Sequence, residues 1–243
     1  MGKTEGVITP LRAPSGLEPG FSALMVSHPS DLATLRKSLK FKEDAGHKLL
    51  MSRLYARDGL AVLGPFMGAP YAVALLEHLT AWGAGNIVFY GWAGTLSAAV
   101  KIADVLIPAH ALVDEGTTRC YYTDPIITSS PDKGIQAHLT ANIDVSPAAI
   151  HAGAVWTTDA LFNETPEKIA HFQAQAALAV EMEASALFSV ASYRSVRIGC
   201  LLAISDDLSR GGWQPGFSGK RFKHTRHRIC SLLPETLMKK GDL

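Results

Sequence analysis

The most informative stretch of the chain is VEMEASAL, residues 180–187, which directly follows the apolar residues 177–179. It places two carboxylates, Glu181 and Glu183, between an apolar run and a segment of helix-forming composition. Carboxylates at the end of a buried strand are costly unless a ligand, a metal ion or hydrogen bonds satisfy them. The stretch therefore predicts a strand-to-helix junction whose acids bind something polar.

A second acidic pair, in the sequence ISDD at residues 204–207, ends the next apolar run. One carboxylate suits the vicinal hydroxyls of a sugar, and another suits a leaving group that must be protonated. The alternative is structural, because Glu183 in a first helical turn complements the helix dipole and Asp206 after a strand can cap a helix. The two pairs together favour an enzyme that acts on a nucleoside or a sugar.

The composition is that of a soluble globular protein. The 243 residues are 47% hydrophobic and 19% charged, with a formal net charge of +1. This balance gives no wide basic field to attract nucleic acid or a membrane surface. The three cysteines are widely spaced and the N-terminal segment has no apolar run, so a reducing, cytoplasmic location is expected. Glycine and proline interrupt the uncharged run at 59–76, so no membrane span is expected.

The pattern along the chain predicts an irregular arm at residues 1–21 and a single α/β domain at 22–243. Alternating strands and helices indicate a parallel or mixed sheet covered on both faces. Thr165 is placed to cap a helix that begins at Pro166, and Gly91 to Gly94 is predicted to form a tight turn. The expected strands are 22–26, 60–63, 86–90, 103–107, 153–156, 178–180 and 196–204, and the expected helices are 32–39, 71–82, 166–176, 183–193 and 219–239.

A basic stretch, KRFKHTRHR at residues 220–228, holds five Lys or Arg and two His residues. It has the composition of a phosphate or RNA contact, but a solvated face of a C-terminal helix fits the near-zero net charge better. His224 and His227 have helical spacing for a metal ion, yet no third ligand is near in the sequence. Neither a metal ion nor a nucleic-acid partner is expected.

Several motifs in order resemble those of the nucleoside phosphorylase and nucleosidase family, especially its uridine-phosphorylase-like branch. The resemblance covers about residues 22–208. Its closest match is VEMEA at residues 180–184, near the family's signature. The other motifs are MGAP at 67–70, GWAG at 91–94, ADVLI at 103–107, DEGT at 114–117 and TDALF at 158–162.

The resemblance implies a three-layer α/β/α fold with a mixed, barrel-like central sheet, assembled as a homo-oligomer, a dimer or a hexamer. It implies cleavage of an N-glycosidic bond without a bound cofactor. Met182, Glu183 and Glu181 are placed with the sugar, and Glu183 would accept hydrogen bonds from the 2′- and 3′-hydroxyls. Asp206 matches the acid that protonates or hydrogen-bonds N7 of a purine. Phe162 or Leu161 would contact the base, with Ser205 beside it.

The phosphate-binding residues of the family are replaced. The family's Gly-Asp-Pro-x-Arg loop reads SHPSD at residues 27–31, a further arginine is Phe89, and a Ser or Thr is Trp92. Phosphate is normally held by arginine forks and backbone amides, so these changes argue against the usual phosphate site. Asp31 falls near the acid with which nucleosidases of the family activate water, and it is the second candidate catalytic residue beside Asp206.

Two acceptors of the sugar therefore stay open. The acceptor loop consists of Ser27, Gly91, Trp92, Gly94 and Thr95. In phosphorolysis, inorganic phosphate would be the co-substrate, held by Thr95, Thr117 and the partner subunit's Arg53 or Arg57. In hydrolysis, Asp31 would activate water. We expect phosphorolysis on the strength of the branch, with a nucleosidase as the alternative and a non-catalytic nucleoside-binding protein as a third reading.

Overall fold

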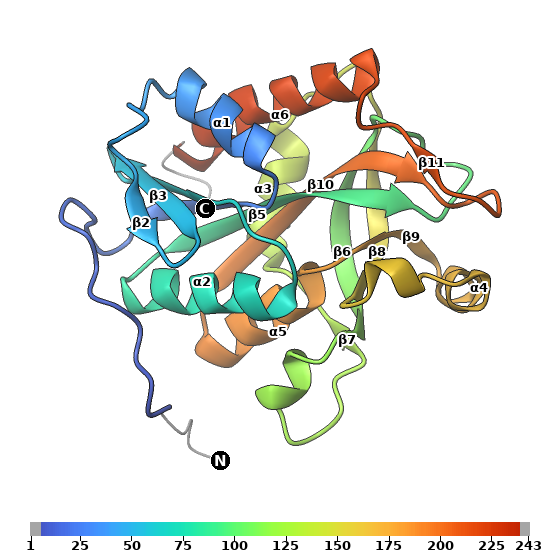
Figure 1. Ribbon diagram of the computed structural model, residues 1–243, viewed down its shortest axis with the longest axis horizontal. Helices are drawn as coiled ribbons and strands as arrows, with labels where there is room; N and C mark the ends of the chain where they lie inside the picture. The colour runs from blue at the N-terminus through green and yellow to red at the C-terminus, as the bar shows by residue number, and fades with distance from the viewer. Residues whose placement is uncertain (1–5, 239–243) are drawn as a thin grey trace.

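The computed structural model describes residues 6–238 as a mixed α/β structure (Figure 1). Residues 1–5 of the predicted arm and Lys239, at the end of the predicted last helix, lie outside the described part. The strands are β1 (Ser22–Val26), β2 (His47–Leu49), β3 (Ser52–Arg57), β4 (Leu60–Gly64), β5 (Asn86–Thr95), β6 (Val105–Asp114), β7 (Thr128–Ser129), β8 (Ile150–Thr158), β9 (Ala177–Glu181), β10 (Arg197–Asp207) and β11 (Gln214–Pro215). The α-helices are α1 (Pro29–Ser38), α2 (Ala69–Ala81), α3 (Lys133–Asn142), α4 (Pro166–Ala174), α5 (Ala184–Arg194) and α6 (Lys220–Met238).

The central sheet closes on itself at one end. Strand β5 pairs with β1, with β9 and with β10, and the order β5-β9-β8-β6-β10 forms a ring. Strands β1, β4, β3 and β2 continue outward from β5 as an open wing. The pairs β1–β5, β5–β10 and β6–β8 are parallel, whereas β5–β9 and β6–β10 are antiparallel. The predicted mixed, barrel-like sheet is confirmed.

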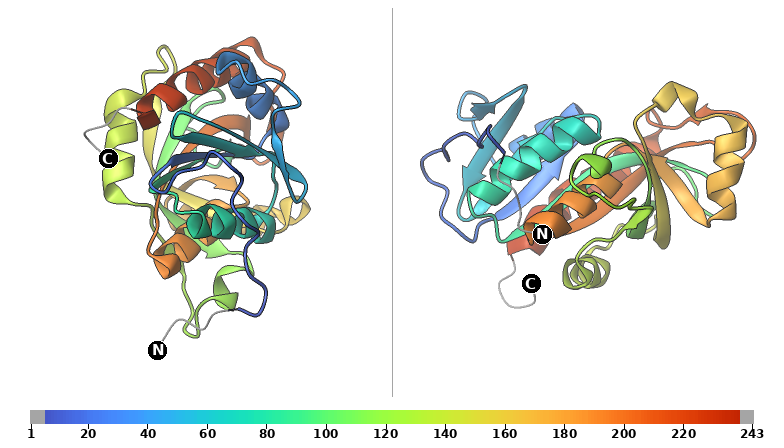
Figure 2. Two further views of the ribbon diagram at one scale, coloured as in Figure 1. Left: turned by 90° about the vertical axis from the view of Figure 1, so that its left-hand side faces the viewer. Right: turned by 90° about the horizontal axis from the view of Figure 1, so that it is seen from below.

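Helices cover both faces of this sheet, which confirms the three-layer arrangement. Helices α2 and α5 lie side by side on one face, and α1, α3 and α6 lie on the other (Figures 1 and 2). Each face has its own apolar core, with Leu75 and Leu187 in one and Leu35 and Leu233 in the other. Helix α4 packs outside the barrel, where Phe172 stacks on Trp156. Among the helices between residues 6 and 238, none is both long and apolar enough to span a membrane.

The predicted tight turn at residues 91–94 is wrong, because β5 runs straight through it to Thr95. The glycines are required by close neighbours rather than by a turn. A Cβ atom on Gly91 would lie 2.7 Å from the ring of Phe89, and one on Gly94 would lie 2.4 Å from Leu208 Cδ1. Phe89 lies two residues earlier on β5 itself and Leu208 directly follows β10, so side chains from both places fill the space beside the β5 backbone.

The predicted strands and helices are all present, with their bounds shifted by a few residues. Thr165 caps α4 as expected, since its side chain accepts a hydrogen bond from Lys168 N. Helix α3 and the β2–β3 hairpin are additional. Asp132 is the N-cap residue of helix α3, and its Oδ1 accepts a hydrogen bond from Ile135 N at 2.9 Å.

Gly64→Ala tests the packing where β4 meets β1. A Cβ atom there would lie 2.2 Å from the carbonyl oxygen of Val26, which is backbone and has little freedom to move. We expect the free energy of unfolding to fall by about 1–3 kcal/mol, measured by urea denaturation. Gly212→Ala is the matched control, because no atom lies within 4 Å of its Cβ position. Equal stability of the two variants would contradict this packing.

Candidate active site

A cavity of about 690 Å³ opens where the strands β1, β4, β5, β9 and β10 end or pass near one another. The sugar residues predicted from the sequence, Glu181, Met182 and Glu183, all line it. Ser205 and Asp206 line it from β10. The sheet therefore brings together the two acidic pairs that lie about 25 residues apart in the sequence.

The side chain of Glu181 forms hydrogen bonds with the start of α5. Its Oε1 accepts a hydrogen bond from Thr157 Oγ1 at 2.5 Å, and its Oε2 accepts from the backbone N of Glu183 at 2.7 Å and of Ala184 at 2.8 Å. Thr157 Oγ1 in turn accepts a hydrogen bond from Ser185 N. The carboxylate thus satisfies amide groups that a helix start leaves unpaired. Its visible role is to fix the junction, and a direct contact with a sugar stays a prediction.

Glu183 is buried but keeps room for further hydrogen bonds. Its Oε1 accepts a hydrogen bond from Gly68 N at 2.5 Å, and its side chain is 6% exposed. Burial and the negative charge of Glu181 raise the pKa of Glu183 to about 8. A carboxylate accepts about four hydrogen bonds, so this side chain is suited to a ligand that brings hydroxyl groups into the cavity.

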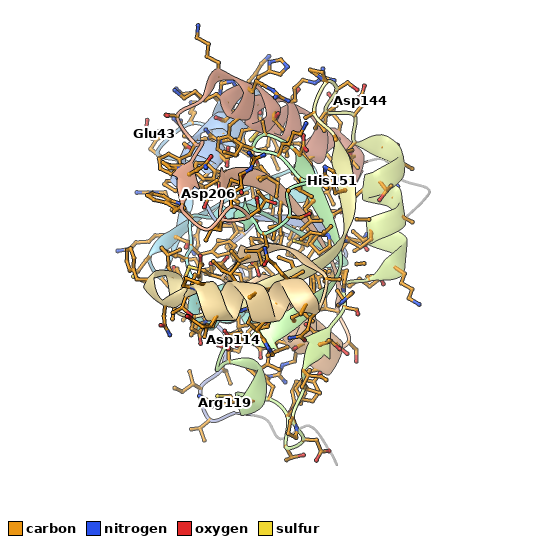
Figure 3. All side chains as sticks on the ribbon, turned by 90° about the vertical axis from the view of Figure 1, so that its right-hand side faces the viewer. Glu43, Asp114, Arg119, Asp144, His151 and Asp206 are labelled. Atoms are coloured by element: carbon orange, nitrogen blue, oxygen red, sulfur yellow. The ribbon has the colours of Figure 1, made fainter. Side chains whose placement is uncertain are left out.

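Asp206 lies at another end of the lining, beside an acid that the sequence analysis missed. Its Oδ1 accepts from Ser205 Oγ at 2.5 Å and its Oδ2 accepts from Trp213 Nε1 at 2.9 Å. Glu164 lines the same cavity, and burial together with the charge of Asp206 raises its pKa to about 7. Figure 3 shows Asp206 above α4, at the end of the molecule where this helix lies in front. The signal available in the sequence was the position of Glu164, two residues after the end of the predicted base segment 158–162.

The two predicted base residues have different surroundings. Leu161 lines the 690 Å³ cavity, whereas the side chain of Phe162 is fully exposed and does not. Phe162 instead lines an adjoining cavity of about 510 Å³, together with Trp213 and Phe217. Between the two neighbours, the structure favours Leu161 for a base bound in the main cavity.

The predicted catalytic role of Asp31 does not agree with its place in the structure. Asp31 is 1% exposed and does not line the cavity. Its Oδ2 accepts from Trp92 Nε1 at 2.6 Å, and its Oδ1 lies 2.6 Å from the Arg226 guanidinium. The indole of Trp92 lines the cavity, and the carboxylate is bound behind it by two donors. An acid held in this way is not available to activate water.

Arg226 also corrects the prediction of a fully solvated basic face. Lys220, Arg221, Lys223 and His224 on α6 are exposed, as expected. Arg226 is buried, donates from Nε to Asp31 at 2.8 Å, and stacks over the rings of Trp92 and Phe222. One member of the basic stretch therefore neutralises the acid that stands where the family has an arginine.

Of the predicted acceptor loop, Ser27, Trp92 and Gly94 line the cavity. Gly91 and Thr95 do not, and the Thr95 hydroxyl donates to the carbonyl of Leu178 at 3.2 Å. The other side chains proposed for a rebuilt phosphate site also lie outside the lining of this chain. They are Thr117, Arg53, whose guanidinium donates to Gly46 O, and Arg57, whose guanidinium donates to Leu39 O.

His28 takes the exposed position in front of Asp31. Its ring stacks on Trp92 with centroids 3.6 Å apart and lines the cavity. Its Nδ1 accepts from Ser30 N at 3.2 Å and lies 2.7 Å from Ser30 Oγ, which itself accepts a hydrogen bond from Arg226. Burial lowers the pKa of His28. These contacts favour a neutral ring protonated at Nε2, so its free nitrogen is a hydrogen-bond donor.

Comparison with known proteins identifies the family and the fold. The sequence profile of the phosphorylase superfamily matches residues 23–237. A DeoD-type purine nucleoside phosphorylase of Dichelobacter nodosus (strain VCS1703A) is 29% identical over 157 residues, which cover 64% of this chain and 66% of that protein, just under two thirds. A guanosine phosphorylase of Halorubrum lacusprofundi is 25% identical over 162 residues, covering 67% of each. The crystal structure of AMP nucleosidase from Bacteroides thetaiotaomicron VPI-5482 has the same fold, with a TM-score of 0.68, 20% identity and 89% coverage of both chains.

Arg226→Met tests the buried ion pair behind the cavity. Removing the cation leaves the Asp31 carboxylate buried without its charge partner, so we expect the free energy of unfolding to fall by about 3–5 kcal/mol. Urea denaturation measures the loss. Arg228→Met is the matched control, because that half-exposed arginine lies 3.9 Å from exposed Asp144 and is expected to contribute below about 1 kcal/mol.

A second substitution distinguishes the ion pair from mere packing. In Arg226→Met with Asp31→Asn, no charge is left unpaired, so the double variant should lose less stability than the two single variants added together. Strictly additive losses would mean that Arg226 and Asp31 stabilise the protein independently.

Proposed function

The chain belongs to the phosphorylase superfamily, and from this membership we propose that it cleaves the N-glycosidic bond of a purine nucleoside. One observation carries the proposal. Buried Glu183, which has acceptor capacity to spare, shares a single cavity with the acids Asp206 and Glu164. A sugar bound by the first and a base beside the other two would place the glycosidic bond between them.

The sugar end of the cavity supplies orientation and charge. Glu183 would form hydrogen bonds with two ring hydroxyls, and a hydrogen bond between uncharged groups contributes about 0.5–1.5 kcal/mol. Met182 lies beside it and packs against the sugar ring in this proposal. Cleavage passes through a cation-like sugar, and nearby acidic side chains would stabilise the developing positive charge.

The base end supports a purine. In this proposal Asp206 is the acid that contacts N7, and Ser205 and Trp213 hold its carboxylate in place. Leu161 provides an apolar wall for the ring. The names of the relatives, a purine nucleoside phosphorylase and a guanosine phosphorylase, are in line with this choice.

Water is the acceptor that the cavity of this chain favours. The charged groups of its lining are the carboxyl groups of Glu164, Glu181, Glu183 and Asp206, accompanied by His28 with its lowered pKa. Phosphate carries up to two negative charges and is normally bound by Arg or Lys. This electrostatic setting reverses the preference drawn from the sequence. The Nε2–H of His28 is the donor that would hold a water molecule.

Phosphorolysis is the second candidate, because both named relatives are phosphorylases. It requires a cation from outside this chain's own lining, such as an arginine of a partner subunit. A homo-oligomer, dimer or hexamer, remains part of the proposal for that reason. Exposed Met51 and Met67 at the cavity lining are where a second copy would contact the substrate.

The acceptor is tested by incubating the protein with guanosine, adenosine, uridine and AMP, each with and without inorganic phosphate. Chromatography resolves the free base, free pentose and pentose 1-phosphate. We expect free pentose from the purine nucleosides, or pentose 5-phosphate from AMP, at the same rate in both buffers. Pentose 1-phosphate formed only with phosphate would establish phosphorolysis instead, and no base release from any substrate would leave only the nucleoside-binding reading.

Glu183→Gln tests the sugar contact. The amide keeps the acceptor for Gly68 N but loses the charge, so we expect kcat/KM on the best purine nucleoside to fall at least about 100-fold. Glu167→Gln at the exposed start of α4 is the control and should retain full activity. Wild-type kinetics of Glu183→Gln would remove this residue from the proposed site.

We also expect Glu183→Gln to change how the melting temperature depends on pH. The pKa of Glu183 is about 8 in the folded protein and 4.5 in a solvated chain, so the unfolded state loses its proton first. Wild-type stability therefore falls as the pH rises from about 4.5 to about 8. Glu183→Gln should melt at a higher temperature than the wild type at pH 8, with the difference shrinking toward pH 4.5. A difference independent of pH would contradict the buried, protonated carboxyl group.

A further inference from the structure

We propose that Glu164 is the acid that delivers a proton to the departing base, with Asp206 as its anionic partner. This inference rests on the proposed function and assigns a catalytic residue to it. Neither the sequence motifs nor the relatives singled out Glu164, which lies between the short helix Leu161–Asn163 and the N-cap residue Thr165 of α4.

Glu164 is placed where three cavities meet. It lines the 690 Å³ cavity that holds the sugar residues, the adjoining 510 Å³ cavity with its aromatic side chains, and a third of about 260 Å³. It shares the first two with Asp206 and Leu161. A base seated against Leu161 would therefore have both carboxyl groups along its edge.

The hydrogen bonds divide the roles between the two acids. Each oxygen of Asp206 accepts a hydrogen bond, one from Ser205 Oγ and one from Trp213 Nε1. Both oxygens of Asp206 are therefore occupied by donors within the protein. Glu164 accepts no hydrogen bond from the residues between 6 and 238, so its carboxyl group is free to turn toward a ligand.

The charges around Glu164 favour its protonated form. Asp206 faces it from β10, and Glu181 and Glu183 lie across the cavity, with His28 as the basic side chain of the lining. Burial and the charge of Asp206 raise the pKa of Glu164 to about 7. An acid with this pKa holds a proton for part of the time at neutral pH and releases it readily, which suits a general acid.

The step balances with water as the acceptor. The bond between C1′ and the base nitrogen breaks and its electron pair goes to the base, while the proton of Glu164 moves to a ring nitrogen of that base. An electron pair of water forms the new bond to C1′. The proton that water loses returns to the Glu164 carboxylate, so free base and free pentose leave and the enzyme is restored.

The test compares two substrates with different needs for a proton. Guanosine must be protonated as its base leaves, whereas the base of 7-methylguanosine already carries a positive charge and departs without one. For Glu164→Gln we expect kcat on guanosine to fall by about 10²–10⁴-fold and kcat on 7-methylguanosine to fall less than about tenfold. Glu167→Gln is the control and should match the wild type on both substrates.

Other outcomes overturn the inference in distinct ways. Equal losses on both substrates would make Glu164 a binding or structural residue, and circular dichroism of Glu164→Gln separates these two. Unchanged rates on both would exclude it from the reaction. If Asp206→Asn, rather than Glu164→Gln, showed the larger loss of kcat on guanosine relative to 7-methylguanosine, Asp206 would be the proton donor. A wild type that releases base from neither substrate would overturn the proposed function and this inference together.

Discussion

The structure depends on one buried carboxylate, that of Glu181, which ties strand β9 to helix α5. It accepts hydrogen bonds from two amide groups at the start of α5 and from the hydroxyl of Thr157 on β8. Desolvation opposes a buried charge and raises the pKa of Glu181 to about 7, and these donors together with the helix dipole offset part of that cost. Because both oxygens are occupied, the junction is rigid, and Glu183 is held at the cavity with its own oxygens largely unused. Glu181, through its hydrogen bonds within the protein, thus positions Glu183, the acid proposed to bind the ligand.

A second buried ion pair determines the electrostatics of the cavity. Arg226 comes from α6, near the end of the chain, and Asp31 from the start of α1. The pair neutralises itself beneath Trp92 and supports Ser30 and His28 in front of it. Where the family places an arginine toward phosphate, this chain therefore presents an aromatic wall and a neutral imidazole. The change removes positive charge from the cavity without leaving a buried charge unpaired.

The buried acids of the cavity lower the free energy of unfolding when they are ionised, as is typical of functional sites. Burial raises the pKa values of Glu164 and Glu183, so both carboxyl groups are less favourable in the folded protein than in water when ionised. Substituting such groups often stabilises a protein while removing its activity. Their retention in one cavity, beside strands that could hold apolar side chains, is consistent with a role in binding and chemistry rather than in folding.

The sequence by itself determined most of the strands and helices, but not α3 or the β2–β3 hairpin, together with the mixed sheet and the junction acids. These features follow from local periodicity, capping residues and a compact motif. It also marked the loss of the phosphate arginines, which is visible residue by residue. Only the tertiary structure decided what the surviving acids do. Arg226, 195 residues away in the sequence, binds Asp31 outside the cavity lining. Glu164 lines the cavity together with Asp206. The packing around β5 was decided in the same way, since Phe89 of β5 and Leu208 after β10 leave no room for a Cβ atom at Gly91 and Gly94. Such contacts join residues that are distant in the chain, and the sequence pattern alone does not show which distant residues lie close together in space.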